Sequence, residues 1–161
     1  MFYSLVRTPN DRTLAMLRIV LGIVFFAHGA QKMLGWFGGP GFSTTMQLFG
    51  EMGVPSLLAF LAIAAEFFGG LALVFGLLGR VAALGIGINM LVAIATVHLQ
   101  HGFFMNWAGS QQGEGFEYHL LVIAISLAVL IKGSGAMSVD RALMHRLRAH
   151  EAETDKERLA A

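Results

Sequence analysis

Six side chains that can carry a charge or transfer a proton lie inside long apolar runs of this sequence: Arg18, His28, Lys32, Glu66, His98 and His119. An ionisable group in the hydrocarbon core of a membrane is costly. Such residues therefore usually face a bundle interior and mark a site, a pathway or a structural pair. Carboxylate, amine and imidazole groups can move protons and hydrogen-bond polar ligands. A polar site between helices is our leading functional hypothesis.

The depths of these groups can be compared by counting along each helix at a rise of about 1.5 Å per residue. His28 then lies about 21 Å from the inner end of its helix and Glu66 about 18 Å, slightly beyond the midplane. Lys32 and His98 lie about 27 Å out, and His119 enters its helix near that level. The sequence thus predicts an inner layer of His28 and Glu66 and an outer layer of the other three.

The chemistry of these side chains suggests roles for them. Glu66 and His28 are the predicted catalytic residues, because a carboxylate and an imidazole can exchange protons. The predicted ligand-binding residues are Lys32, His98, His119 and Arg18. Structural alternatives remain open: Glu66 could pair with His28 or Arg18, and Lys32 and Arg18 could extend their charges to the membrane surfaces.

Helical periodicity indicates which of these residues share a face. At about 100° per residue, Arg18, His28 and Lys32 fall within a stripe of about 80°, which we expect to point into the bundle. Asn89 lies roughly opposite His98 on its helix, so it is predicted to form an interhelical hydrogen bond outside the site.

A metal site is an alternative at the outer rim. His98 and His101 lie three residues apart on one helical face, and Glu117 is nearby in the predicted arrangement, so these three are candidate metal ligands. Histidines on facing helices could also bind haem without a covalent link. The chain has no cysteine, which excludes thiolate ligands, disulfides and a thiol relay within it.

Four apolar blocks predict the fold. The chain is 56% apolar and 13% charged, against about 25% charged residues in soluble domains. The predicted transmembrane helices cover about 14–34, 56–78, 80–101 and 115–132, of which the last is short for a bilayer. We predict an all-α polytopic membrane protein: one domain over 1–161, folded as an antiparallel four-helix bundle. We expect no cleavable signal peptide, because the first block is too long for one.

The positive charges predict the orientation. Ten of the eleven Lys and Arg residues flank one side and only Lys32 lies near the other, so both termini are expected to be cytoplasmic. The linker at 35–55 is rich in glycine and is predicted to be a tightly turned outer loop. The tail at 133–161 is predicted to form a short amphipathic helix from Ser138, with residues after Glu151 frayed. A net charge of +1 gives no case for nucleic-acid binding.

Several short motifs along residues 14–143 resemble those of the DoxX family of small four-helix membrane proteins. They are Leu17-Arg18, His28-Gly29 with Lys32, Glu66-Phe67-Phe68-Gly69-Gly70, Arg80 with His98, Gly115-Phe116-Glu117, and Gly135 with Ser138-Val139-Asp140. The resemblance implies a multi-pass protein of the bacterial inner membrane. It also implies a connection to quinone-linked oxidoreductases, some relatives being subunits of a thiosulfate:quinone oxidoreductase, or to oxidative stress.

Three functions fit these observations. The first is a quinone-linked oxidoreductase or its membrane subunit, whose electrons come from a soluble redox partner because the chain lacks cysteine and a flavin fingerprint. The second is a metal- or haem-binding membrane protein. The third is a non-catalytic scaffold for soluble redox proteins, or a small transporter. Formation of a homo-oligomer is compatible with each of them.

Overall fold

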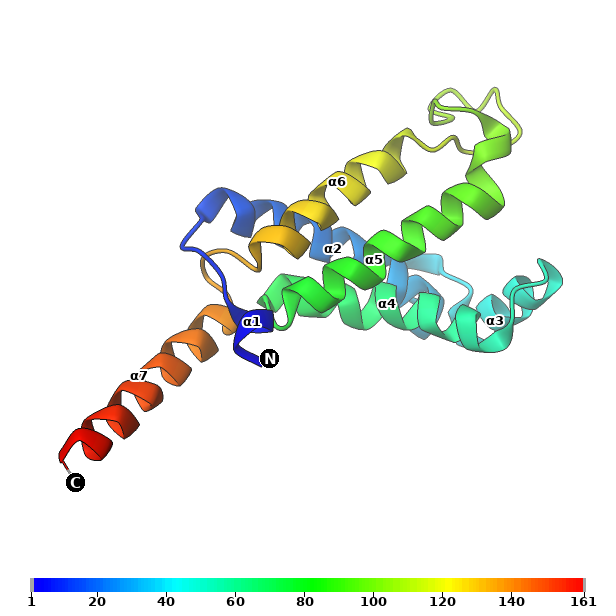
Figure 1. Ribbon diagram of the computed structural model, residues 1–161. Coiled ribbons are helices and arrows are strands. Elements are labelled where there is room, and N and C mark those ends of the chain that lie inside the picture. Colours follow the sequence, from blue (N-terminus) through cyan, green and yellow to red (C-terminus); the bar gives the residue numbers. More distant parts are fainter. Residues whose placement is uncertain (1, 161) are drawn as a thin grey trace.

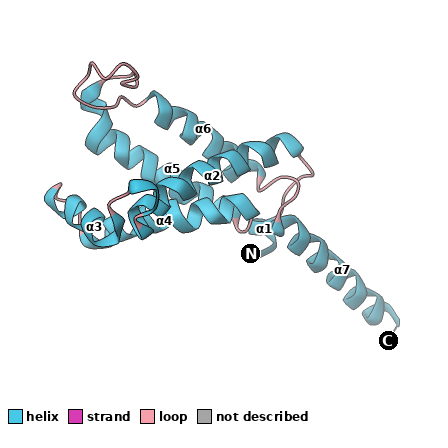
Figure 2. Cartoon of the chain, turned by 180° about the vertical axis from the view of Figure 1, so that it is seen from behind, coloured by secondary structure: helices cyan, strands magenta, loops and turns pink. Residues whose placement is uncertain are grey.

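The chain folds into helices, with no strand among residues 2–160, which a computed structural model describes (Figures 1 and 2). The elements follow in the order α1 (Phe2–Val6), α2 (Arg12–Leu34), η1 (Trp36–Gly38), α3 (Gly41–Glu51), α4 (Ser56–Phe75), α5 (Gly79–Ala93), η2 (Ile94–His98), η3 (Leu99–His101), α6 (Glu117–Lys132) and α7 (Val139–Ala160). The all-α prediction is confirmed for the described residues.

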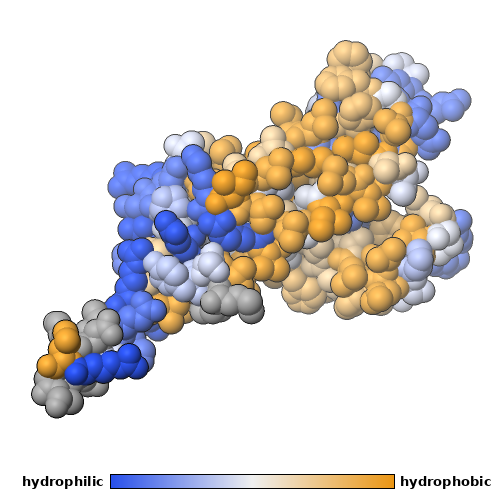
Figure 3. All heavy atoms as spheres, in the orientation of Figure 1, coloured by the Kyte–Doolittle hydropathy of each residue, from blue (hydrophilic) through white to orange (hydrophobic). Residues whose placement is uncertain are grey.

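Three of these helices are long and apolar enough to cross a membrane: α2, α4, and α5 with its continuation to His101. α6 has 16 residues and matches the fourth predicted span from Glu117 onward. It also exposes large apolar side chains, including Leu121 and Ile131. In Figure 3 apolar atoms cover the middle of the visible face, and hydrophilic atoms gather near the start of α7 and at the opposite end.

Glycines let α2 and α4 approach closely. A side chain at Gly29 of α2 would overlap the backbone of Phe67, and one at Gly70 of α4 would overlap the backbone of Phe26. Small residues that allow such backbone contact are the usual basis of helix association in membranes. α5 packs against both α4 and α6, and α6 also contacts α2. Each of these four helices therefore contacts two of the others.

Gly29→Ala is expected to destabilise the protein, by about 1–3 kcal/mol, because the added methyl group would push α2 away from α4. Gly50→Ala is the matched control, since a side chain at Gly50 of α3 would meet no atom within 4 Å. Thermal unfolding in detergent, followed by circular dichroism, would measure both. Equal midpoints for the two variants would show that the close contact between α2 and α4 contributes little to stability.

A buried polar network closes the end of the helices from which α7 departs. Arg18, which is 0% exposed, donates from Nε to the Ser134 carbonyl (2.7 Å) and from one terminal nitrogen to the carbonyls of Leu73 and Val74. Its other terminal nitrogen donates to the Met137 carbonyl. One guanidinium thus joins α2, the end of α4 and the segment that follows α6. Arg18 therefore has backbone partners at this end, and its ligand-binding role stays a prediction.

Asp140 completes this network from the first turn of α7. Its carboxylate accepts hydrogen bonds from the backbone N–H groups of Leu78 (2.7 Å) and Gly79 (3.0 Å) and from the Ser134 hydroxyl (2.5 Å). The first N–H groups of a helix lack partners within that helix, and a carboxylate there is favourable. Asp140 therefore caps the start of α5 from a distant part of the chain, a role that its position in the sequence does not reveal.

Two segments differ from their predicted form. Residues 41–51 of the outer linker form the helix α3. The chain turns before this helix, at Gly35 and Gly41, where φ is positive (73° and 76°). The residues that follow Gly41 are therefore able to form a helix. α7 is not short: it runs for 22 residues and projects away from the other helices (Figure 1). Its predicted N-cap is confirmed by the bond from the Arg141 N–H to the Ser138 hydroxyl (3.2 Å).

The helices diverge toward the end that holds α3 and the loop at 102–116, which we call the loop end. Both ribbon views show α5 and α6 leaning away from α2, α3 and α4 there (Figures 1 and 2). The space-filling view shows a notch between these two groups of helices (Figure 3). The helical turn widens to a π-helix at η2, and such turns often bend helices and mark functional sites.

Candidate functional site

Glu66 of α4 lies at the centre of the polar residues, and it is only 6% exposed. Its Oε2 atom forms an ion pair with Nζ of Lys32 on α2, and its Oε1 atom accepts a hydrogen bond from Nδ2 of Asn89 on α5 (3.0 Å). The close approach at Gly29 brings α2 within reach, because Lys32 follows Gly29 by one helical turn. Three helices therefore meet at one carboxylate.

These contacts revise the partners expected for Glu66. It pairs with Lys32, and not with His28 or Arg18 as the structural alternatives had it. Asn89 does form the predicted interhelical hydrogen bond, but it bonds the site carboxylate itself. The sequence feature that pointed to this contact is the Asn89 side-chain amide, which lies on a neighbouring helix at a depth similar to that of Glu66. The depth estimate had placed Lys32 in the outer layer, and the length of the lysine side chain lets it reach back to Glu66.

Tyr118 on α6 packs against the hydrophobic core of the helices. Its Oη atom is buried without a hydrogen-bond partner in the described structure. Buried polar atoms nearly always have a partner, so an orphaned one calls for a functional explanation. Tyr118 lies in a cluster of aromatic residues beside an outer linker, a pattern typical of residues at a membrane interface.

The two predicted outer-layer histidines come together. The ring centroids of His98 and His119 lie 4.1 Å apart, and the rings are tilted by 45°. Nδ1 of His98 lies 2.8 Å from the Glu114 carbonyl, so this nitrogen carries the proton when the ring is neutral. His119 is buried, and its Nδ1 has no partner among the described residues. The predicted layer thus consists of this histidine pair, and Lys32 belongs with Glu66.

His28 is exposed, although it lies on a face of α2 that is buried elsewhere. It follows Leu21 by seven residues, so both lie on nearly the same face of α2. Leu21 is 3% exposed, whereas His28 is exposed. This face of α2 is therefore covered at Leu21 and uncovered at His28. His28 was expected to point into the bundle, and the structure leaves it exposed instead.

The three candidate metal ligands do not converge. The ring of His101 packs against Gly113, and Glu117 accepts a hydrogen bond from the Met105 N–H (2.9 Å) while His98 faces Glu114 and His119. No group of three His, Asp or Glu side chains among the described residues could hold a metal ion. The described structure therefore does not bring His98, His101 and Glu117 together as a three-residue ligand cluster.

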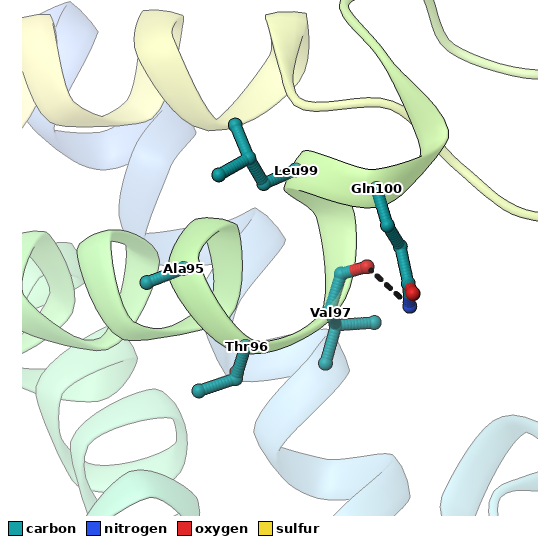
Figure 4. A pocket seen from close by; sticks show the side chains of 5 residues that line it. All are labelled: Ala95, Thr96, Val97, Leu99 and Gln100. Atoms are coloured by element: carbon teal, nitrogen blue, oxygen red, sulfur yellow. Dashed lines mark hydrogen bonds between the residues drawn. The ribbon is translucent and has the colours of Figure 1, made fainter.

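A surface hollow of about 270 Å³ lies beside η2, lined by Ala95, Thr96, Val97, Leu99 and Gln100 (Figure 4). Its polar groups are satisfied locally: the Gln100 amide donates to the Val97 carbonyl (3.2 Å) and the Thr96 hydroxyl to the Val92 carbonyl (2.8 Å). None of its lining residues contacts Glu66 in the described structure. The hollow therefore reflects the bent backbone, and the polar site lies elsewhere.

Comparison with known proteins gives consistent matches. The DoxX family model matches residues 13–99. The Bacillus subtilis protein named "Putative oxidoreductase CatD" is 35% identical over 125 residues, which cover 78% of this chain and 82% of that protein. The Escherichia coli protein named "Inner membrane protein YqjF" is 34% identical over 135 residues, which cover 83% and 94%. No solved structure matches the chain.

Proposed function

This chain belongs to the DoxX family, and we propose that it acts as a quinone-linked oxidoreductase of the bacterial membrane or as the membrane subunit of one. The observation that carries the proposal is the buried Glu66 carboxylate of α4, held by Lys32 of α2 and Asn89 of α5, three helices that are long and apolar enough to cross a membrane. Ionisable groups kept at membrane depth are expensive, and they mark ligand or proton sites. The oxidoreductase name of the Bacillus subtilis relative agrees with this reading.

The donor groups around Glu66 suit a quinone head group. A quinone presents two carbonyl oxygens, which need hydrogen-bond donors. The orphaned Tyr118 hydroxyl and His119 imidazole are unused donors, and the Lys32 ammonium has two further N–H groups beyond its bond to Glu66. Phe26 and Phe67, whose ring centroids lie 5.4 Å apart, provide apolar surface beside the Glu66 backbone. His28 is exposed on α2, where a lipid-soluble molecule could reach it.

The chemistry divides between the ligand and the protein. Reduction of a quinone to a quinol takes up two electrons and two protons. Lys32 would hold one head-group oxygen by a charge-assisted hydrogen bond, and Glu66 would give or accept a proton at a carboxylate oxygen. The electrons would come from a soluble redox protein, since the sequence contains no cysteine. We propose that this partner docks on the cytoplasmic side, near α7.

The proposed orientation places both termini in the cytoplasm and α6 as a fourth crossing. The absence of cysteine makes this easy to test with single-cysteine variants. Gln112→Cys, in the exposed loop, is expected to react with a membrane-impermeant maleimide on intact spheroplasts, and Ala149→Cys, on exposed α7, is expected to react only after lysis. Labelling of Ala149→Cys in intact spheroplasts, or equal labelling of both variants, would contradict the topology.

The ligand itself can be tested in lipid nanodiscs. Trp36 packs edge-on against Phe26 (centroids 6.5 Å apart), which lies next to the site, so a bound quinone should quench its fluorescence. A short-chain ubiquinone is expected to give saturable quenching. An alkylbenzene of the same chain length, which lacks the carbonyls, should not compete. Quenching that rises linearly with quinone would indicate partitioning into lipid only, and it would favour a scaffold without a ligand site.

A further inference from the structure

We propose that a group of largely exposed cations around the start of α7 binds the headgroups of anionic phospholipids. We call these residues the basic collar: Arg7, Arg12, Lys132, Arg141 and Arg146. They lie at the end of the molecule from which α7 departs, opposite the loop end. Neither Glu66 nor a quinone takes part in this binding, so its test is independent of the proposed function.

Hydrogen bonds bring together the separate segments that carry the collar. The Arg80 guanidinium, at the start of α5, donates to the Ile131 carbonyl at the end of α6 (2.8 Å) and to the Arg7 carbonyl (3.3 Å). The Ala136 N–H, in the segment before α7, donates to the Asp11 carbonyl at the start of α2 (2.9 Å). α1 also contacts α7. The cations of these segments therefore share one end of the molecule.

Carboxylates of the chain do not form ion pairs with the collar. Among the described residues the one ion pair joins Lys32 to Glu66, in the polar site. The two acids nearest the collar in the sequence are engaged by backbone N–H groups: Asp11 caps α2 and Asp140 caps α5. All collar side chains are exposed except that of Arg141, which is half-buried. Their positive charge is therefore available to an anion from outside the chain.

Exposed apolar side chains border the collar and indicate its level in the membrane. Ile131, which is 71% exposed, directly precedes Lys132, and Val139, which is 40% exposed, lies two residues before Arg141. In Figure 3 the hydrophilic atoms near the start of α7 likewise adjoin the apolar middle of the visible face. A change from exposed apolar to exposed cationic side chains is typical of the boundary between acyl chains and headgroups. We therefore expect the collar at headgroup level.

The charge of α7 changes sign along its length, which favours a membrane surface over a soluble partner. Residues 139–150 contain three arginines and one acid, Asp140, which caps α5, whereas residues 151–160 contain four acids and two bases. The first part is about 18 Å long, and the potential of an anionic membrane decays over about 8 Å. Because α7 projects away from the other helices (Figure 1), its acidic part extends beyond this potential. An acidic soluble protein on α7 would be repelled by that part.

Native mass spectrometry of the detergent-purified protein tests this binding, because it resolves each bound lipid. Phosphatidylglycerol, which is anionic, is expected to bind the wild type at least about fivefold more tightly than zwitterionic phosphatidylcholine. Lys132→Gln and Arg146→Gln are each expected to weaken binding of phosphatidylglycerol by roughly fivefold, because each removes one cation near the headgroups. Arg158→Gln is the matched control: Arg158 is exposed in the acidic part of α7, and this variant should bind like the wild type.

Equal affinities of the wild type for the two lipids would overturn the proposal, and so would equal losses in Arg158→Gln and the two collar variants. A preference for phosphatidylglycerol that does not weaken as the ionic strength rises would also overturn it, because salt screens the attraction between exposed charges. Lys132 and Arg146 are both exposed, so their variants should fold, which circular dichroism would confirm. Because no quinone is present, none of these results bears on the proposed function.

Discussion

Glu66→Gln is expected to weaken binding of a short-chain quinone by about tenfold or more and to leave the protein folded. Glutamine has the size of glutamate and can still accept the hydrogen bond from Asn89, so the packing of the helices around position 66 should persist. The neutral amide, however, cannot hold the Lys32 ammonium at this depth, and the lysine can then extend toward the membrane surface. A charge-assisted hydrogen bond is worth about 1.5–3 kcal/mol, which corresponds to roughly tenfold to a hundredfold in affinity.

The fluorescence titration in nanodiscs measures this loss, and thermal unfolding of the same sample reports on the fold. Glu51→Gln is the matched control, because Glu51 is exposed on α3, where it accepts a hydrogen bond from Gln47, and it should bind quinone like the wild type. A Glu66→Gln protein that unfolds readily, with unchanged affinity in the fraction that stays folded, would mean that the Lys32–Glu66 pair is structural.

Arg18→Met is expected to cause the largest loss of stability, about 3 kcal/mol or more. Methionine has a similar length but no N–H groups, so the carbonyls of Ser134 and Val74 lose their buried donor. The Asp140 carboxylate also loses the positive charge that faces it. Buried acceptors without partners and an uncompensated charge are the two most costly changes that a helix interior can undergo.

Arg12→Met provides the comparison for this prediction. Arg12 is the first residue of α2 and is exposed, so its replacement removes the same charge without opening the network. Unfolding by increasing concentrations of a denaturing detergent, followed by circular dichroism, should show a clear loss of stability for Arg18→Met and little change for Arg12→Met. Similar curves for both variants would show that charge alone matters at this end, and that the buried hydrogen bonds do not.

The sequence predicted the helices well because apolar runs and helical periodicity are local properties. The spans at 14–34, 56–78 and 80–101 correspond to α2, α4 and the helix from Gly79 to His101. It also identified Glu66 and Lys32 as candidates to face the interior, since a charge at membrane depth is costly. The partner of each was not predictable, because pairing depends on the rotation of one helix against another.

Other features depend on tertiary structure and could not be predicted from local patterns. His28 lies within the polar stripe of α2, but it is exposed, and exposure depends on where the other helices pack. The π-helical turn at η2 has more residues than an α-helical turn, and no residue in the sequence marks it as a proline marks a kink. Such a turn changes the direction of the side chains that follow it, including that of His98 relative to Asn89. Asp140 lies 61 residues from Gly79, whose N–H it binds, so its capping role appears only in the folded chain.

The most direct test of the central claim is to purify the protein from its native membrane in mild detergent. The extracted lipophilic compounds would be analysed by mass spectrometry, together with an optical spectrum and a metal analysis. We expect a quinone bound in about a one-to-one ratio in the wild type, well above its share in the bulk lipid, and reduced to that share in Glu66→Gln. A colourless, metal-free protein with no more quinone than the surrounding lipid would contradict it, and would favour the scaffold function.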